Sequence, residues 1–150
     1  MGDLVKKRVM AAGKFDILHL GHIAYLEQAR ELAGPEGELV VVIALDKTIQ
    51  HERGAPPVFP DNQRRKIVEA LAIVDRAVLG YETHDPSRIV ADVQPDILAL
   101  GYDQLKDTTN LQKALDNRGL NVKIVRLEKR DADGLCSSTL IRKRIIDFYR

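Results

Sequence analysis

Two histidines, His19 and His22, stand three residues apart in the segment GKFDILHLGH (residues 13–22), with Gly21 between them. Residues three apart lie on the same face of a helix, so the two imidazoles share one face if a helix begins near His19. The first N–H groups of a helix carry partial positive charge and favour phosphate. Because Gly21 has no side chain, a ligand could approach the main chain closely there. These residues predict a site for a phosphorylated ligand.

The charge of the two imidazoles should depend on that ligand. A helix N-terminus disfavours imidazolium and a bound polyphosphate favours it, so we expect the site to gain positive charge when the ligand binds. Two other interpretations fit the same spacing. The histidines could be solvated or capping residues, or they could bind zinc. Zinc is less favoured because Asp16 is the only carboxylate or thiol at ligand spacing nearby.

The rest of the chain alternates between strand patterns and helix patterns. Apolar runs predict strands at residues 9–12, 38–46, 76–80, 96–101 and 122–127. Helical spacing and end signals predict helices at residues 21–33, 87–94, 110–119 and 137–150, and a further helix that starts at Asp61. The buried stripe expected for that further helix is Ile67, Val68, Leu71 and Val74. Glycine and three prolines indicate a loop at residues 51–60.

This alternation predicts an α/β fold. We expect one Rossmann-like, doubly wound domain over residues 1–150, with helices on both faces of a five-stranded parallel sheet of order 3-2-1-4-5. In that order the first and fourth strands are neighbours at the crevice where such sheets bind ligands. The histidine segment and GYDQ (residues 101–104) follow these two strands and should therefore meet at the crevice.

Composition excludes several classes of protein. The chain has 150 residues and a formal net charge of +1, which argues against bulk electrostatic binding to nucleic acid. No apolar run approaches the roughly 20 residues of a membrane span. The single cysteine, Cys136, excludes an intrachain disulfide and suits a reducing cytoplasm. We expect its side chain to be a small apolar filler.

Two motifs resemble those of a known family. GKFDILHLGH resembles the signature G-[TV]-F-D-x-x-H-x-G-H of the nucleotidyltransferases related to cytidylyltransferases, with Lys14 where the family usually has Thr or Val. SSTLIR (residues 137–142) resembles their second signature, which opens the last helix. Within the family, residues 59–80, 95–104 and 117–130 are similar to the archaeal FAD synthase group. The likeness covers nearly the whole sequence.

The resemblance implies nucleotidyl transfer, in which a phosphate oxygen of FMN attacks the α-phosphorus of ATP and pyrophosphate leaves. A phosphate monoester with a second pKa of about 6 is ionised at neutral pH and needs no general base. Catalysis would then be positional and electrostatic. The resemblance also implies Mg²⁺ or another divalent cation, held mainly by phosphates and water, and a homodimer.

Two alternatives remain open for the function. One is a CTP-dependent cytidylyltransferase that acts on glycerol 3-phosphate or another small phosphorylated acceptor. The other is a nucleotide-binding module without catalysis. The intact histidine pair argues against the second alternative.

The resemblance also assigns residues to roles. His19 and His22 would contact the triphosphate and stabilise the transition state. The implied nucleotide contacts are Lys14, Phe15, His19, Leu20, Gly21, His22, Asp103, Arg130, Ser138, Thr139 and Arg142. Lys47 and Arg53 follow the second strand, where they would either neutralise the acceptor phosphate or be solvated. Arg64 and Arg65 would contact the acceptor or form surface salt bridges.

Overall fold

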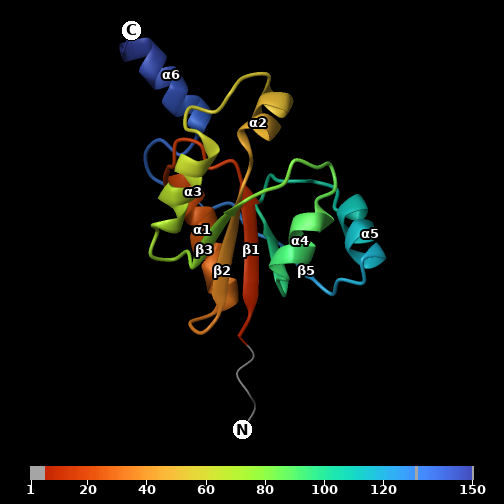
Figure 1. Cartoon of the computed structure of the whole chain (residues 1–150). Helices are drawn as coiled ribbons and strands as arrows, with labels where there is room; N and C mark the ends of the chain where they lie inside the picture. Colours follow the sequence, from red (N-terminus) through yellow and green to blue (C-terminus); the bar gives the residue numbers. More distant parts are fainter. Residues whose placement is uncertain (1–5, 131, 150) are drawn as a thin grey trace.

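The computed structural model describes residues 6–130 and 132–149. They form a parallel sheet of five strands in the order β3-β2-β1-β4-β5 (Figure 1). The strands are β1 (Arg8–Gly13), β2 (Glu38–Ile43), β3 (Arg76–Leu79), β4 (Ile97–Leu100) and β5 (Lys123–Arg126). The predicted α/β fold and strand order are confirmed, and β1 and β4 are neighbours at the expected crevice.

Helices cover both faces of the sheet, as predicted (Figure 1). Those in the described residues are α1 (Leu20–Ala33), α2 (Asp46–Arg53), α3 (Asp61–Glu69), α4 (Ser87–Val93), α5 (Thr109–Asn117) and α6 (Ser138–Phe148). α1 and α3 pack on one face, and α4 and α5 pack on the other. None of these helices is long and apolar enough to cross a membrane.

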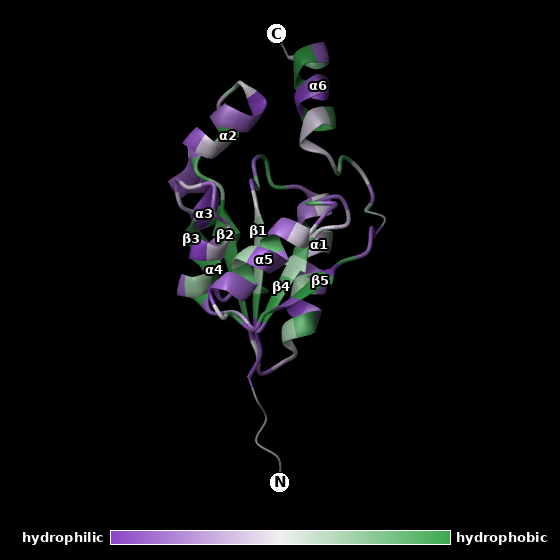
Figure 2. Ribbon diagram, turned by 90° about the vertical axis from the view of Figure 1, so that its right-hand side faces the viewer, coloured by the Kyte–Doolittle hydropathy of each residue, from purple (hydrophilic) through white to green (hydrophobic). Residues whose placement is uncertain are grey.

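The core has two layers because successive strand residues point to opposite faces of the sheet. Val9 and Ala11 of β1 pack with Leu26 of α1. Met10, which lies between them in sequence, packs on the other side with Leu115 of α5. The strands that both layers enclose are mostly apolar (Figure 2). This two-sided burial explains why the strands are continuous apolar runs.

Two local predictions were wrong around the second crossover. The strand expected to reach Asp46 ends at Ile43, and α2 replaces part of the predicted strand and loop. α2 has Ile49 as its only buried residue, so it lacks a clear apolar stripe in the sequence. The stripe predicted for the helix at Asp61 was also partly wrong. α3 ends at Glu69, so Leu71 and Val74 lie beyond it, and Ile67 is exposed whereas Arg64 is buried.

The last helix, α6, has no buried residue. It extends away from the sheet at the same end of the molecule as α2 (Figures 1 and 2). Its N-cap is Ser137, whose side chain accepts a hydrogen bond from the N–H of Leu140. The first turn of α6 nevertheless reaches the crevice, where Ser138, Thr139 and Arg142 line a cavity.

Candidate functional site

The two histidines cap the first turn of α1 reciprocally. His19 is the N-cap, and its Nδ1 accepts a hydrogen bond of 3.1 Å from the N–H of Gly21. Nδ1 of His22 accepts a hydrogen bond of 3.1 Å from the N–H of His19. The imidazole rings are stacked, with centroids 3.8 Å apart. Both rings therefore lie together at the helix end, as the spacing predicts.

These bonds determine where a neutral imidazole carries its proton. Because Nδ1 accepts in both rings, the single proton must be on Nε2, which can donate to a ligand. The pKa of His22 is lowered to about 4, chiefly by burial and also by the neighbouring His19, while Asp16 acts to raise it. Burial also lowers the pKa of His19. The free site thus presents two neutral Nε2–H donors near pH 7.

We expect the free energy of unfolding to decrease as the pH falls from about 6.5 towards about 4. The unfolded chain has His22 with its ordinary pKa and binds the proton first, so acid favours unfolding in this window. Denaturant titrations near pH 7 and near pH 5 measure the change. The variant His22→Asn keeps an acceptor for the main chain but does not titrate, so it should lose less stability. An equal loss in both proteins would contradict the low pKa.

The packing of the chain itself requires a glycine at residue 21. A Cβ atom at this position would lie 2.7 Å from the carbonyl oxygen of Cys136 and 2.9 Å from Cε1 of His19. The loop before α6 therefore packs directly on the first turn of α1. The side chain of Cys136 is exposed, so its predicted role as an apolar filler was wrong.

Two cavities meet at His22. The first has a volume of about 370 Å³ and lies between the start of α1 and the loops that follow β4 and β5. The second has a volume of about 720 Å³ and lies between the loop after β1, α2, the β3–α4 loop and the first turn of α6. The residues that line both cavities are His22, Tyr25, Asp103 and Gln104. The imidazole of His22 is therefore within reach from either cavity.

The structure distributes the predicted site residues between these cavities. The first cavity is lined by His19, Gly21, His22, Asp103 and Arg130. The second is lined by Lys14, Phe15, His22, Arg53, Asp103, Ser138, Thr139 and Arg142. Leu20 and Lys47 line neither cavity. Lys47 instead pairs with Glu82, with Nζ 3.5 Å from the carboxylate.

Three cations line the second cavity. Nζ of Lys14 lies 3.4 Å from Glu52. The guanidinium of Arg53 lies 3.8 Å from Asp16 and donates to the carbonyl of Pro56 at 2.8 Å. Arg142 differs, because its Nη1 is the one buried side-chain nitrogen or oxygen of the described ranges that has no hydrogen-bond partner.

The first cavity carries a cation that is already paired. Arg130 binds Glu31 of α1 through two hydrogen bonds of 2.9 and 3.1 Å. The segment just before Arg130 is held to α1 by Gln28 of that helix. The side-chain amide of Gln28 donates to the carbonyl of Glu128 at 2.8 Å and accepts from the N–H of Glu128 at 3.1 Å. Arg130 would have to give up Glu31 before it could bind a phosphate.

Sequence reasoning missed the residues that join β1 to β4 beneath the cavities. Tyr25 donates from its hydroxyl to the carbonyl of Ala99 at 2.7 Å, and burial raises its pKa. Gln104 accepts from Gly101 at 2.8 Å and donates to the carbonyl of Ala12 at 2.9 Å. Tyr25 could have been found, because it lies three residues after His22 on the same face of α1. Nothing in the sequence marked Gln104 as a bridge.

The described part of the chain contains no group of three or more His, Cys, Asp or Glu side chains that could hold a metal ion.

The chain matches the cytidylyltransferase-like family over residues 10–144. It is 45% identical to the FAD synthase of Archaeoglobus profundus over 143 residues, which cover 95% of this chain and 88% of that protein. It is 48% identical to the FAD synthase of Thermoplasma acidophilum over 140 residues, which cover 93% and 94%.

Solved structures show the same fold. One, described as a lipopolysaccharide core biosynthesis protein from Thermoplasma volcanium, is 48% identical with a TM-score of 0.76, over 83% of this chain and 98% of that one. A pantoate–β-alanine ligase from Francisella tularensis is 14% identical with a TM-score of 0.58, over 94% and 67%. The second likeness concerns the fold alone.

Proposed function

This chain belongs to the cytidylyltransferase-like family, and we propose that it catalyses the reaction of an FAD synthase, in which the adenylyl group of ATP passes to FMN and pyrophosphate leaves. Relatives with this activity in their names are 42–48% identical to it over nearly its whole length. The observation that carries the proposal is the stacked imidazole pair where two cavities meet. That junction can hold a phosphorus atom between two substrates.

In this proposal the first cavity holds the base and ribose of ATP, with Asp103 beside them, and the second holds FMN. The transferring phosphates lie between the cavities, close to His22 and the first turn of α6. There Ser138, Thr139 and Arg142 would bind phosphate oxygens. Arg53, the predicted acceptor residue that lines the second cavity, would neutralise the FMN phosphate.

The residues of the chain act by position and charge. The ionised FMN phosphate is the nucleophile, so no side chain has to remove a proton from it. His19 and His22 donate from Nε2–H to oxygens of the ATP phosphates, and these bonds strengthen as charge develops on those oxygens in the transition state. We propose neutral donors in place of the imidazolium expected from the sequence. A second proton would go to Nδ1 and break the caps of α1.

Three further features of the working enzyme are proposals. Mg²⁺ or another divalent cation enters with the phosphates of ATP and offsets their charge. The enzyme is a cytoplasmic homodimer, which the family resemblance implies and the exposed apolar side chains of α6 support. Residues 1–150 form a single domain.

The reaction is tested by supplying the protein with Mg²⁺ and each pairing of ATP or CTP with FMN or glycerol 3-phosphate. We expect FAD and pyrophosphate from ATP with FMN and no product from the other pairs. We also expect ATP to raise the melting temperature more than CTP, because a ligand stabilises the state that it binds. A CDP-linked product would favour the cytidylyltransferase alternative. ATP binding without any product would favour the non-catalytic module.

A further inference from the structure

Arg64 is an arginine whose side chain is fully buried although α3 lies on the surface of the sheet. Burying a guanidinium is unfavourable unless its N–H groups are all paired. Each of its nitrogens is paired. Nε donates to the carbonyl of Phe59 at 2.9 Å, Nη1 to the carbonyl of Lys14 at 2.7 Å, and Nη2 to the carboxylate of Asp46 at 2.8 Å. One side chain thus holds three segments: the α2–α3 connection, the loop before the histidines, and the start of α2.

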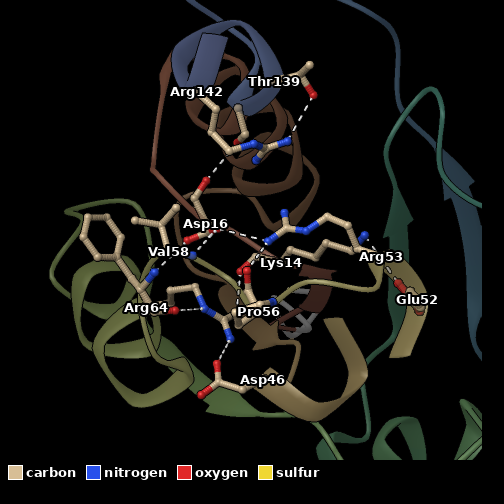
Figure 3. A network of polar contacts seen from close by, with 12 residues as sticks. Lys14, Asp16, Asp46, Glu52, Arg53, Pro56, Val58, Arg64, Thr139 and Arg142 are labelled. Atoms are coloured by element: carbon tan, nitrogen blue, oxygen red, sulfur yellow. Dashed lines mark hydrogen bonds and ion pairs between the residues drawn. The ribbon is translucent and has the colours of Figure 1, made fainter. Parts of the chain in front are cut away.

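Asp16 joins the same segments from the other side. Its buried carboxylate accepts hydrogen bonds from the N–H groups of Val58 at 2.8 Å and Phe59 at 3.0 Å. Its main-chain carbonyl accepts a hydrogen bond of 2.9 Å from the hydroxyl of Ser138 at the start of α6. Figure 3 shows Asp16 between Val58 and Arg53, with Arg64 reaching to Asp46. The histidine loop is therefore fastened to α2, α3 and α6 at once.

The loop that these contacts hold has an unfavourable main-chain conformation. Phe15 has a φ of 50° and Ile17 a φ of 53°, so both residues that flank Asp16 lie in the left-handed region. A β-branched residue rarely adopts this region. Such a conformation persists only where surrounding contacts enforce it. Ile17 is two residues from His19, so relaxation of the loop would displace the imidazoles.

We propose that Arg64 and Asp16 are positioning residues, which hold the strained loop 14–18 and so keep His19 and His22 directed at the junction of the two cavities. Neither residue is a catalytic group, because the Arg64 side chain has no exposed surface and both Asp16 oxygens are engaged by main-chain N–H groups. The structure gives Arg64 neither of the roles predicted from the sequence. Its neighbour Arg65 does form the predicted surface contact, with Glu69 at 3.4 Å.

The test compares Arg64→Lys with Arg65→Lys. Lysine keeps the charge but has one nitrogen, which cannot bind three separated acceptors. We expect Arg64→Lys to lower kcat by at least about tenfold, with a smaller change in the KM for ATP, because displaced catalytic groups chiefly affect the chemical step. Arg65→Lys changes the same residue type one position away on the surface, and it should leave kcat within about twofold of the parent value.

A second readout does not need the enzymatic reaction. In the free protein, the imidazole NMR signals of His19 and His22 should shift in Arg64→Lys and remain in place in Arg65→Lys. The kinetic measurement rests on the proposed function, but the NMR measurement does not. If the protein had no FAD synthase activity, the NMR signals would still test the positioning role. If Arg64→Lys does not fold, Asp16→Asn is the test variant. Asparagine matches aspartate in size, but an NH₂ group replaces one of the two carboxylate oxygens and cannot accept a hydrogen bond. One of the N–H groups of Val58 and Phe59 would then lose its acceptor.

We expect Asp16→Asn to reproduce the kinetic and NMR changes of Arg64→Lys. In the double variant the two losses in kcat should combine to less than their product, because both side chains hold the same loop. A lower melting temperature with unchanged kcat and unchanged histidine signals would overturn the proposal. That result would leave the contacts with a purely structural role.

Discussion

His22→Asn is expected to lower turnover by about 10²–10³-fold, the loss typical for removing one donor that stabilises transition-state charge. Asparagine can place its amide oxygen near the position of Nδ1, so it preserves the bond from the N–H of His19 that caps α1. It has no group at the position of Nε2. The affinity for ATP, measured by calorimetry, should change far less than kcat, because the lost bond is strongest in the transition state.

Two further substitutions sharpen this test. His22→Gln can place an amide N–H near the position of Nε2, so it should retain more activity than His22→Asn if a neutral donor is what the reaction requires. His84→Asn changes an exposed histidine that lines neither cavity, and it should retain full turnover. An undiminished kcat in His22→Asn would remove this imidazole from the reaction. Equal losses in the asparagine and glutamine variants would argue that charge is needed.

Gly21→Ala is expected to lower kcat/KM for ATP by about 100-fold, because a displacement of about 1 Å near the reacting groups can cost that much. The added Cβ would lie 2.7 Å from the carbonyl oxygen of Cys136 and 3.0 Å from Nδ1 of His19. The loop before α6 therefore has to move, and so does the His19 ring, whose Cε1 would lie 2.9 Å from the added Cβ. Both movements change the rim of the first cavity, which Cys136 and His19 line. Steady-state kinetics with varied ATP measure the loss.

The control for Gly21→Ala is Lys113→Ala, which introduces the same side chain at an exposed position of α5 that lines neither cavity. It should leave kcat/KM within about twofold of the parent value, since exposed substitutions away from a site have small effects. A crystal structure of Gly21→Ala should show a displaced carbonyl at Cys136. Full activity together with an unmoved loop would show that the close approach is not required.

Much of the fold could be predicted because its signals are local. The apolar run at residues 39–43 and the helical spacing of Leu26 and Ala29 reflect burial that repeats along one element. The predicted strand order is the one usual for a doubly wound sheet once five strand–helix units are recognised, and the structure confirms it. α2 was missed because Ile49 is its only buried residue, so its helical pattern could not be read from apolar spacing.

The sequence by itself determined the α/β architecture, a helix that begins within two residues of His19, and the meeting of the histidine segment with the GYDQ loop. The first two depend on spacing between neighbouring residues, and the third follows from the strand order usual in a doubly wound sheet. Only the tertiary structure decided that the site consists of two cavities that share His22. It also decided that the carbonyl of Cys136 approaches Gly21 closely and that Arg64 is buried. These depend on which distant atoms come together. Arg64 binds a carbonyl 50 residues away, and a local pattern carries no record of such a partner.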